Sequence, residues 1–231
     1  MSSSREVILK KLRSSRRPFE DVPPPPETYR PALRVEDDSR PALIARFVHE
    51  MALLKGEAFV VQGDAGAREK ILQLLRAHQA GHVLAWDFRH IPVDGLADAL
   101  RESSIEVTIP LPHQDRSPEA MAHFGHATAG ISGVDAALAL TGTLVLSSGE
   151  GRGRIPTVLP PIWIAVVAAE QIVPRFEDWL AQERARGMST VYSRANLAFV
   201  TGPSRTGDIE MELILGVHGP GTEYVIIKES D

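Results

Sequence analysis

Apolar residues recur at helical spacing in several stretches of the chain. The first helix is predicted to begin at Ser39, with Pro41 in its first turn and Gly56 at its end. Its apolar side chains fall on one face: Leu43, Phe47, Met51 and Leu54. A second helix is predicted to be capped by Asp64, and a short third helix covers residues 96–100. The apolar face of the second helix consists of Ile71, Leu74 and Leu75.

Short apolar runs lie between these helices and predict strands. In the first half of the chain they cover residues 58–61, 83–86 and 105–109. Because strands and helices alternate at the spacing of βαβ units, the pattern favours a mostly parallel sheet.

The second half of the chain is richer in strand patterns. Strands are predicted at residues 136–140, 144–146, 162–168, 197–200 and 224–227. The first two flank Thr141-Gly142-Thr143, which indicates a hairpin or a bulge, and the long run 162–168 is typical of a central strand. A helix is predicted from Pro174 to about Arg186. The expected fold is α/β, with an open, mixed, mostly parallel sheet and helices on both faces.

The N-terminal segment has a different pattern. Residues 4–14 predict a short helix, and residues 18–31 contain four consecutive prolines, which favour a stiff, extended connector. We therefore expect a helix and proline-rich linker over residues 1–38, followed by an α/β domain over residues 39–231. The alternative for the proline segment is a partner-binding site.

Composition narrows the functional classes. The 231 residues carry a net charge of −5, which disfavours nucleic-acid binding, and no apolar run is long enough for a membrane span. The chain contains no cysteine, which excludes a thiol nucleophile, a disulfide framework and a thiolate-held iron–sulfur cluster within it. The absence of cysteine also fits a cytoplasmic location, which we expect.

Turn-forming and polar residues are concentrated in the segment 202–210. The chain is predicted to turn into a helix that Ser204 or Thr206 caps. Asp208 and Glu210 would occupy the first turn, where negative charge is favourable.

Arg205 in this segment has two interpretations. With the backbone amides at the helix end, it would bind a carboxylate or a phosphate. In the alternative, Asp208 and Glu210 satisfy the helix end and pair with Arg205, and no anion site remains.

A second polar stretch begins near residue 130. Gly130 and Gly133 allow a close backbone approach, and Asp135 precedes an apolar strand, where it is either a functional carboxylate or the first residue of a turn. The glycine-rich segment 149–154 is interpreted as a mobile lid or a surface loop, with ligand contact by Arg152 or Arg154 as the alternative.

The histidines offer two further candidates. His123 and His126 have the i,i+3 spacing of helix-borne metal ligands, but without cysteines nearby a solvated or core-edge role is favoured, as it is for His113. We therefore expect no metal site. His218 is either an acid/base beside the first stretch or a structural donor at Gly219-Pro220.

These stretches also resemble the lactate-utilisation protein C family, which carries the LUD domain. The matching segments are Gly130-Ile131-Ser132-Gly133 with Asp135, Thr141 to Leu146, Pro160-Pro161, Gly202 to Thr206 with Asp208-Ile209-Glu210, and Leu215 to Pro220. Two positions depart from the family pattern. Leu140 stands where glutamate is usual, and Gly207 stands where alanine is common.

The resemblance implies a fold like that of sugar-phosphate isomerases and coenzyme A transferases. It also implies a role in oxidising L-lactate to pyruvate and in electron transport, alongside iron–sulfur partner subunits. Since this chain has no cysteine, thiolate-held clusters are expected in the partners.

Three hypotheses follow: an accessory subunit that binds a small anionic ligand, a stand-alone enzyme acting on a phosphate or acyl-coenzyme A substrate, or a scaffold without a ligand. The catalytic candidates are Asp135, Asp208, Glu210 and His218. The candidate ligand-binding residues are Gly133, Thr141, Gly142, Thr143, Gly202, Ser204, Arg205, Thr206 and Gly219.

Overall fold

The computed structural model describes residues 4–14, 35–111, 117–207 and 213–230. The chain divides into two units, Met1–Arg34 and Val35–Asp231. In the first unit, α1 (Ser4–Ser14) confirms the predicted N-terminal helix. The proline-rich segment 18–31 lies outside the described residues.

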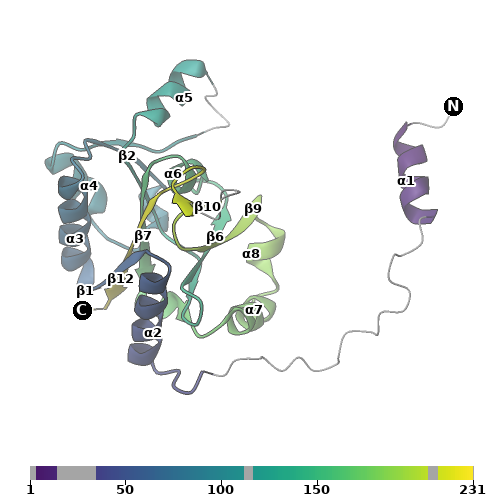
Figure 1. Ribbon diagram of the computed structural model, residues 1–231, viewed down its shortest axis with the longest axis horizontal. Coiled ribbons are helices and arrows are strands. Elements are labelled where there is room, and N and C mark those ends of the chain that lie inside the picture. Colours follow the sequence, from purple (N-terminus) through teal and green to yellow (C-terminus); the bar gives the residue numbers. More distant parts are fainter. Residues whose placement is uncertain (1–3, 15–34, 112–116, 208–212, 231) are drawn as a thin grey trace. The chain divides into compact units, whose positions relative to one another are not determined.

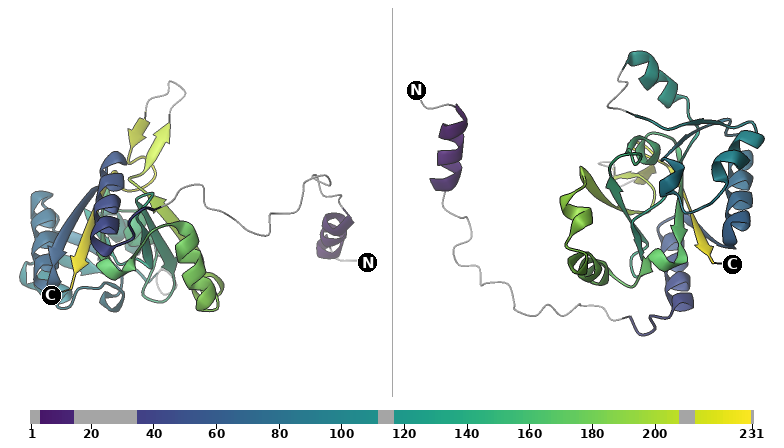
Figure 2. Two further views of the ribbon diagram at one scale, coloured as in Figure 1. Left: turned by 90° about the horizontal axis from the view of Figure 1, so that it is seen from below. Right: turned by 180° about the vertical axis from the view of Figure 1, so that it is seen from behind.

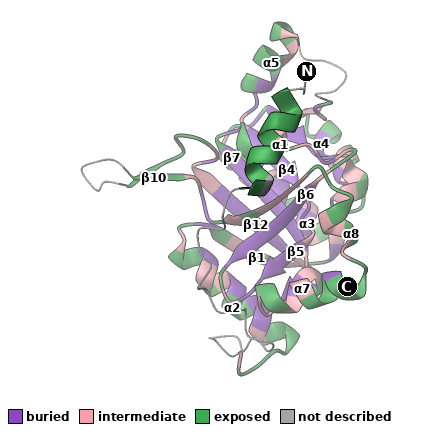
Figure 3. Ribbon diagram, turned by 90° about the vertical axis from the view of Figure 1, so that its right-hand side faces the viewer, coloured by how far each residue is buried: buried purple, intermediate pink, exposed green. Residues whose placement is uncertain are grey.

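A parallel sheet of six strands forms the centre of the second unit (Figure 1). The strands, in sheet order, are β1 (Glu57–Gln62), β12 (Thr222–Glu229), β7 (Ile162–Ala168), β4 (Ala129–Ser132), β2 (His82–Ala85) and β3 (Glu106–Thr108). The apolar run 162–168 is β7, a central strand as predicted. The strands labelled β12, β7 and β4 in Figure 3 are mostly buried, which fits a parallel sheet covered on both faces, whereas the edge strand β1 is intermediate or exposed along its length.

Helices α3 (Gly63–Ala77) and α4 (Leu96–Glu102) pack beside this sheet. On β12, Tyr224 points toward α3, where its hydroxyl lies 2.8 Å from Nε2 of His78. Because side chains alternate along a strand, Glu223 and Val225 point to the opposite face. Helix α2 (Arg40–Leu53) follows that face: Arg40 Nη1 donates to the carbonyl oxygens of Ala169 and Ile172.

A second sheet packs against the main sheet through a shared hydrophobic core. Its order is β8 (Ile172–Val173), β5 (Ala136–Leu138), β6 (Thr143–Ser148) and β9 (Asn196–Thr201). The antiparallel pair β5–β6 is the predicted hairpin. Helix α7 (Phe176–Ala185) covers the outer side, where Trp179 packs with Leu138 and Val145. The predicted α/β fold with a mostly parallel sheet is confirmed. The second sheet, together with helices, covers one face of the main sheet.

Short elements complete the unit: η1 (Phe88–His90), α5 (Pro118–Gly125), α6 (Ile155–Val158), η2 (Ala169–Gln171) and α8 (Ser189–Tyr192). One cap prediction is wrong. Helix α3 begins at Gly63, and Asp64 lies in its first turn, where it accepts a hydrogen bond from Lys228. None of the described helices combines the length and the apolar character that crossing a membrane requires.

The helix predicted after Pro203 is also wrong. Residues Arg205–Gly207 form β10, which pairs antiparallel with β11 (Leu213–Leu215) in a hairpin that projects from the body (Figure 2). The backbone of residues 205–207 bonds to the apolar strand β11 and does not begin a helix capped by Ser204 or Thr206. Asp208 and Glu210, which suggested the helix end, lie outside the described residues.

Candidate functional site

The structure divides the predicted site residues between two places, the C-terminal end of β4 and the region before the N-terminal end of β1. Gly133 follows the C-terminal end of β4, where a Cβ would lie 2.1 Å from the carbonyl oxygen of His90. Gly142 and Gly202 both abut Leu54, which stands just before the N-terminal end of β1. The register makes Ser132, the last residue of β4, level with Ala58 near the start of β1, so the two groups differ in their place across the sheet, with β7 and β12 between these two strands.

Beyond the C-terminal end of β4, Asp135 pairs with Arg152. Arg152 Nη2 lies 2.5 Å from Asp135 Oδ1 and 2.6 Å from Ser147 Oγ, and the guanidinium stacks 4.9 Å from the centroid of the Trp86 ring. Arg152 is only 8% exposed, so the surface-loop prediction is wrong for this residue, whereas Arg154 is exposed. This ion pair fastens the segment 149–154 to the start of the second sheet.

Gly142, Gly202 and Arg205 lie together at the C-terminal end of α2, before β1 begins. Arg205 Nη2 donates to the carbonyl oxygen of Leu54. Gly202 has a φ of 79°, and a Cβ there would lie 2.7 Å from Arg205 Nη2. Glycine at this position therefore leaves the room in which the guanidinium sits.

Three threonine hydroxyls form a chain beside these glycines. Thr143 Oγ1 lies 2.7 Å from Thr141 Oγ1 and 2.8 Å from Thr201 Oγ1, so the chain links β6 to β9. Each hydroxyl both donates and accepts, so the chain can turn its terminal proton toward an acceptor or away from it.

Glu223 is a residue of this region that the sequence analysis did not identify. It lies on β12 with 1% exposure, and neither carboxyl oxygen has a hydrogen-bond partner among the residues that the structure describes. Burial raises the pKa of Glu223 to about 7, although the positive charge of Arg205 acts in the opposite direction. The available signal was one acidic residue directly before the apolar run 224–227. A buried, unpaired carboxyl with a shifted pKa is a candidate functional group.

Backbone hydrogen bonds fix the chain around this group. Ser204 receives a hydrogen bond from the amide of Gly216 on its carbonyl oxygen and donates its own amide to Pro220. The carbonyl oxygen of Pro161 accepts from the amides of Gly221 and Thr222. The Pro160-Pro161 and Gly219-Pro220 motifs thus anchor the base of the hairpin to β7 and β12.

The remaining candidates take less central places. Gly219 packs near the Ser204 side chain, Thr206 is half-buried on β10, and His218 is exposed in the segment after β11. His113 lies outside the described residues, while His123 joins His82 and Glu106 in a separate cluster of metal-ligating side chains.

Comparisons with known proteins agree with the motifs. A family model described as "LUD domain" matches residues 44–227. Lactate utilization protein C of Geobacillus sp. (strain WCH70) is 33% identical over 167 residues, covering 70% of this chain and 68% of the relative. The protein of the same name from Halalkalibacterium halodurans is 30% identical over 161 residues, with the same coverage of 70% and 68%.

A solved structure shares the fold. The crystal structure of a DUF162 family protein from Deinococcus radiodurans matches with a TM-score of 0.59 and 20% identity, over 82% of this chain and 98% of that chain. At this level of identity the likeness concerns the arrangement of helices and strands alone.

Proposed function

Because the chain belongs to the LUD domain family and resembles proteins named lactate utilization protein C, we propose that it is a subunit of an L-lactate oxidation system. Such a system converts L-lactate to pyruvate and passes two electrons onward. With no cysteine in this chain, thiolate-held iron–sulfur clusters would belong to partner subunits. The observation that carries the proposal is the meeting of Arg205, Glu223 and the threonine chain near the C-terminal end of α2.

Arg205 is suited to hold the carboxylate of a small 2-hydroxy or 2-oxo acid. A guanidinium presents a planar set of donors that matches a carboxylate, and its charge remains at every physiological pH. The bond to the carbonyl oxygen of Leu54 holds the side chain in place before a ligand arrives. Less conformational freedom is then lost on binding.

Glu223 would serve as the proton acceptor for the hydroxyl group of the bound acid. A general base works best when its pKa lies near the operating pH, and burial brings Glu223 to about 7. The electrons would leave toward the partner subunits, so this chain would bind the acid and take the hydroxyl proton.

The exposed hairpin favours a second candidate function, a scaffold that docks a partner. Leu213 and Ile214 on β11 are 69% and 47% exposed, and Val217 beyond it is 49% exposed. Apolar groups at such positions are typical of contact surfaces. The stand-alone phosphate or acyl-coenzyme A enzyme remains the third candidate.

Replacing Arg205 with alanine is expected to weaken the response to L-lactate and pyruvate. In a thermal-shift measurement on the purified chain, either acid at millimolar concentration should raise the Tm of the unmodified protein. Arg205→Ala should weaken binding about tenfold to a hundredfold, because hydrogen bonds to charged groups contribute about 1.5–3 kcal/mol. Arg184→Ala, at an exposed position on α7, is the matched control.

Other ligands separate the candidate functions. A shift with phosphate or coenzyme A but not with either acid would favour the stand-alone enzyme. No shift with any compound, together with capture of a partner subunit that depends on the hairpin, would favour the scaffold. Equal binding by Arg205→Ala and the unmodified chain would reject the proposed anion site.

Replacing Gly202 with alanine is expected to displace Arg205 without removing it. The new Cβ would collide with Nη2, and a φ of 79° would add about 1–2 kcal/mol of backbone strain. Acid binding should weaken while circular dichroism stays native. Gly207→Ala is the control, since a Cβ there meets nothing within 4 Å. Native affinity in Gly202→Ala would show that the position of Arg205 is unimportant.

A further inference from the structure

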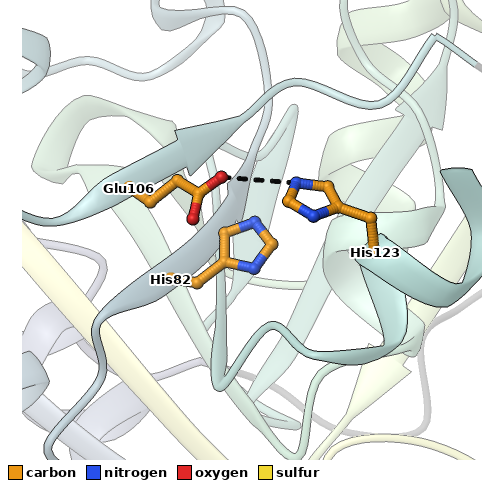
Figure 4. A group of neighbouring side chains, drawn as sticks. All are labelled: His82, Glu106 and His123. Atoms are coloured by element: carbon orange, nitrogen blue, oxygen red, sulfur yellow. Dashed lines mark ion pairs between the residues drawn. The ribbon is translucent and has the colours of Figure 1, made fainter.

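Three metal-ligating side chains converge beside β2 and β3, at the side of the main sheet that ends with the edge strand β3. His82 begins β2 and Glu106 begins β3, and these two residues are direct partners in the parallel register. His123 comes from α5, near the C-terminal end of that helix. In Figure 4 the two imidazole rings and the carboxylate surround one small space.

The distances place the donor atoms close to coordination geometry. Each residue offers one ligand atom, and the three atoms lie within 4.8 Å of one another. His123 Nε2 is 3.4 Å from Glu106 Oε1, and the two imidazole centroids are 4.6 Å apart. Ligands about 2.0–2.1 Å from a tetrahedral ion lie about 3.4 Å apart, so shifts of about 1 Å would complete the set.

The side chains that must move are free to do so. The side chains of Glu106 and His123 are 59% and 47% exposed, whereas His82 is held between strands with 9% exposure. The site thus has one fixed ligand and two adjustable ones. Two imidazole nitrogens and one carboxylate oxygen, with a position left for water, form the donor set of open zinc sites.

We propose that His82, Glu106 and His123 bind a divalent transition-metal ion of the zinc class. The ion would fasten α5 to β2 and to the edge strand β3, where the apolar contact is small: Phe124 and Ala127 pack against Leu84. The sequence pattern of His123 and His126 suggested a different pair, and the fold instead brings His123 to ligands from two strands.

Thr108 adds a supporting hydroxyl: its Oγ1 lies 3.0 Å from His82 Nε2 and 3.2 Å from His123 Nε2. After both nitrogens turn to the ion, this hydroxyl is placed to bond a water ligand.

Calorimetric titration of the full-length chain, freed of metal by a chelator and of any histidine tag, tests the proposal. We expect one zinc ion per chain with a Kd of about micromolar or tighter, and a higher Tm in its presence. Cobalt(II) should bind in the same place and give the visible absorption of a four- or five-coordinate site. Magnesium should not displace zinc, because it prefers oxygen ligands.

Variants at the exposed ligands separate the site from adventitious binding. Glu106→Gln and His123→Ala should each weaken zinc binding by about tenfold or more and remove the cobalt absorption. His126→Ala and His218→Ala, which change exposed histidines outside the cluster, should bind zinc as before. No zinc binding by the unmodified chain would overturn the proposal. So would native affinity in Glu106→Gln and His123→Ala, or a loss confined to His126→Ala.

Discussion

Replacing Glu223 with glutamine is expected to remove a pH-dependent loss of stability from the protein. The Glu223 pKa is about 7 in the folded chain and 4.5 in the unfolded reference, so the folded state binds the proton more tightly. Its contribution is therefore fully present below pH 4.5 and is lost as the pH rises through 7. Since one pKa unit corresponds to 1.36 kcal/mol, the loss amounts to about 3 kcal/mol.

Urea unfolding between pH 4.5 and pH 8 measures this effect. The unfolding free energy of the unmodified chain should fall relative to that of Glu223→Gln across this interval. Glu57→Gln changes an exposed glutamate at the start of the neighbouring strand and should keep the original slope. Parallel pH profiles for Glu223→Gln and the unmodified chain would contradict the assignment.

A methionine at the same position separates stability from function. Glu223→Met removes a carboxyl that accepts no hydrogen bond within the described part of the chain and fills the space with an apolar side chain. It should be more stable than the unmodified chain at pH 8, because an unpaired charge is costly to bury. If Glu223 accepts a proton from the substrate, the same variant loses turnover in the assembled system, as expected when a functional group is retained at the expense of stability.

Replacing Arg152 with alanine is expected to produce the largest loss of stability. The variant leaves the Asp135 carboxylate largely buried without its partner and removes the bond to Ser147 and the stacking on Trp86. Breaking a buried pair from one side costs about 3–5 kcal/mol. The loss is large because removal of the guanidinium leaves the opposite charge unpaired.

Chemical denaturation of matched variants tests this account. Arg154→Ala, two residues away and exposed, should change the unfolding free energy by no more than about 0.5 kcal/mol. The double variant Asp135→Asn with Arg152→Met should be more stable than Arg152→Ala, because no unpaired charge is left. Equal stabilities of Arg152→Ala and Arg154→Ala would show that the ion pair contributes little.

Regular elements could be predicted from the sequence because their signals are local. The apolar run of β7 and the hairpin around Thr141–Thr143 each depend on neighbouring residues and were predicted correctly. The hairpin β10–β11 was missed because Ser204 and Thr206 also resemble helix caps. Only pairing of Arg205 with Leu215, ten positions along the chain, selects the strand.

The candidate sites depend on contacts that no local pattern records. His82, Glu106 and His123 come from three separate elements, and only the order of the strands brings them together. Likewise, the motif residues at 130–143 read as one stretch in the sequence. In the folded protein, Asp135 lies beside Val145 at one end of the paired strands β5 and β6, whereas Thr143 pairs with Leu138 at the other end.

The position of β12 has a consequence for how the chain folds. This strand comes last in the described sequence, yet it lies between β1 and β7, and Gln62 Nε2 donates to Glu229 Oε2 across 167 residues. During synthesis on the ribosome, β1 and β7 cannot become part of one sheet until β12 has been made, because β12 pairs with both of them. Chaperone dependence should therefore be greatest just before β12 emerges, and truncation ahead of Thr222 should leave a nascent chain that cannot complete its core.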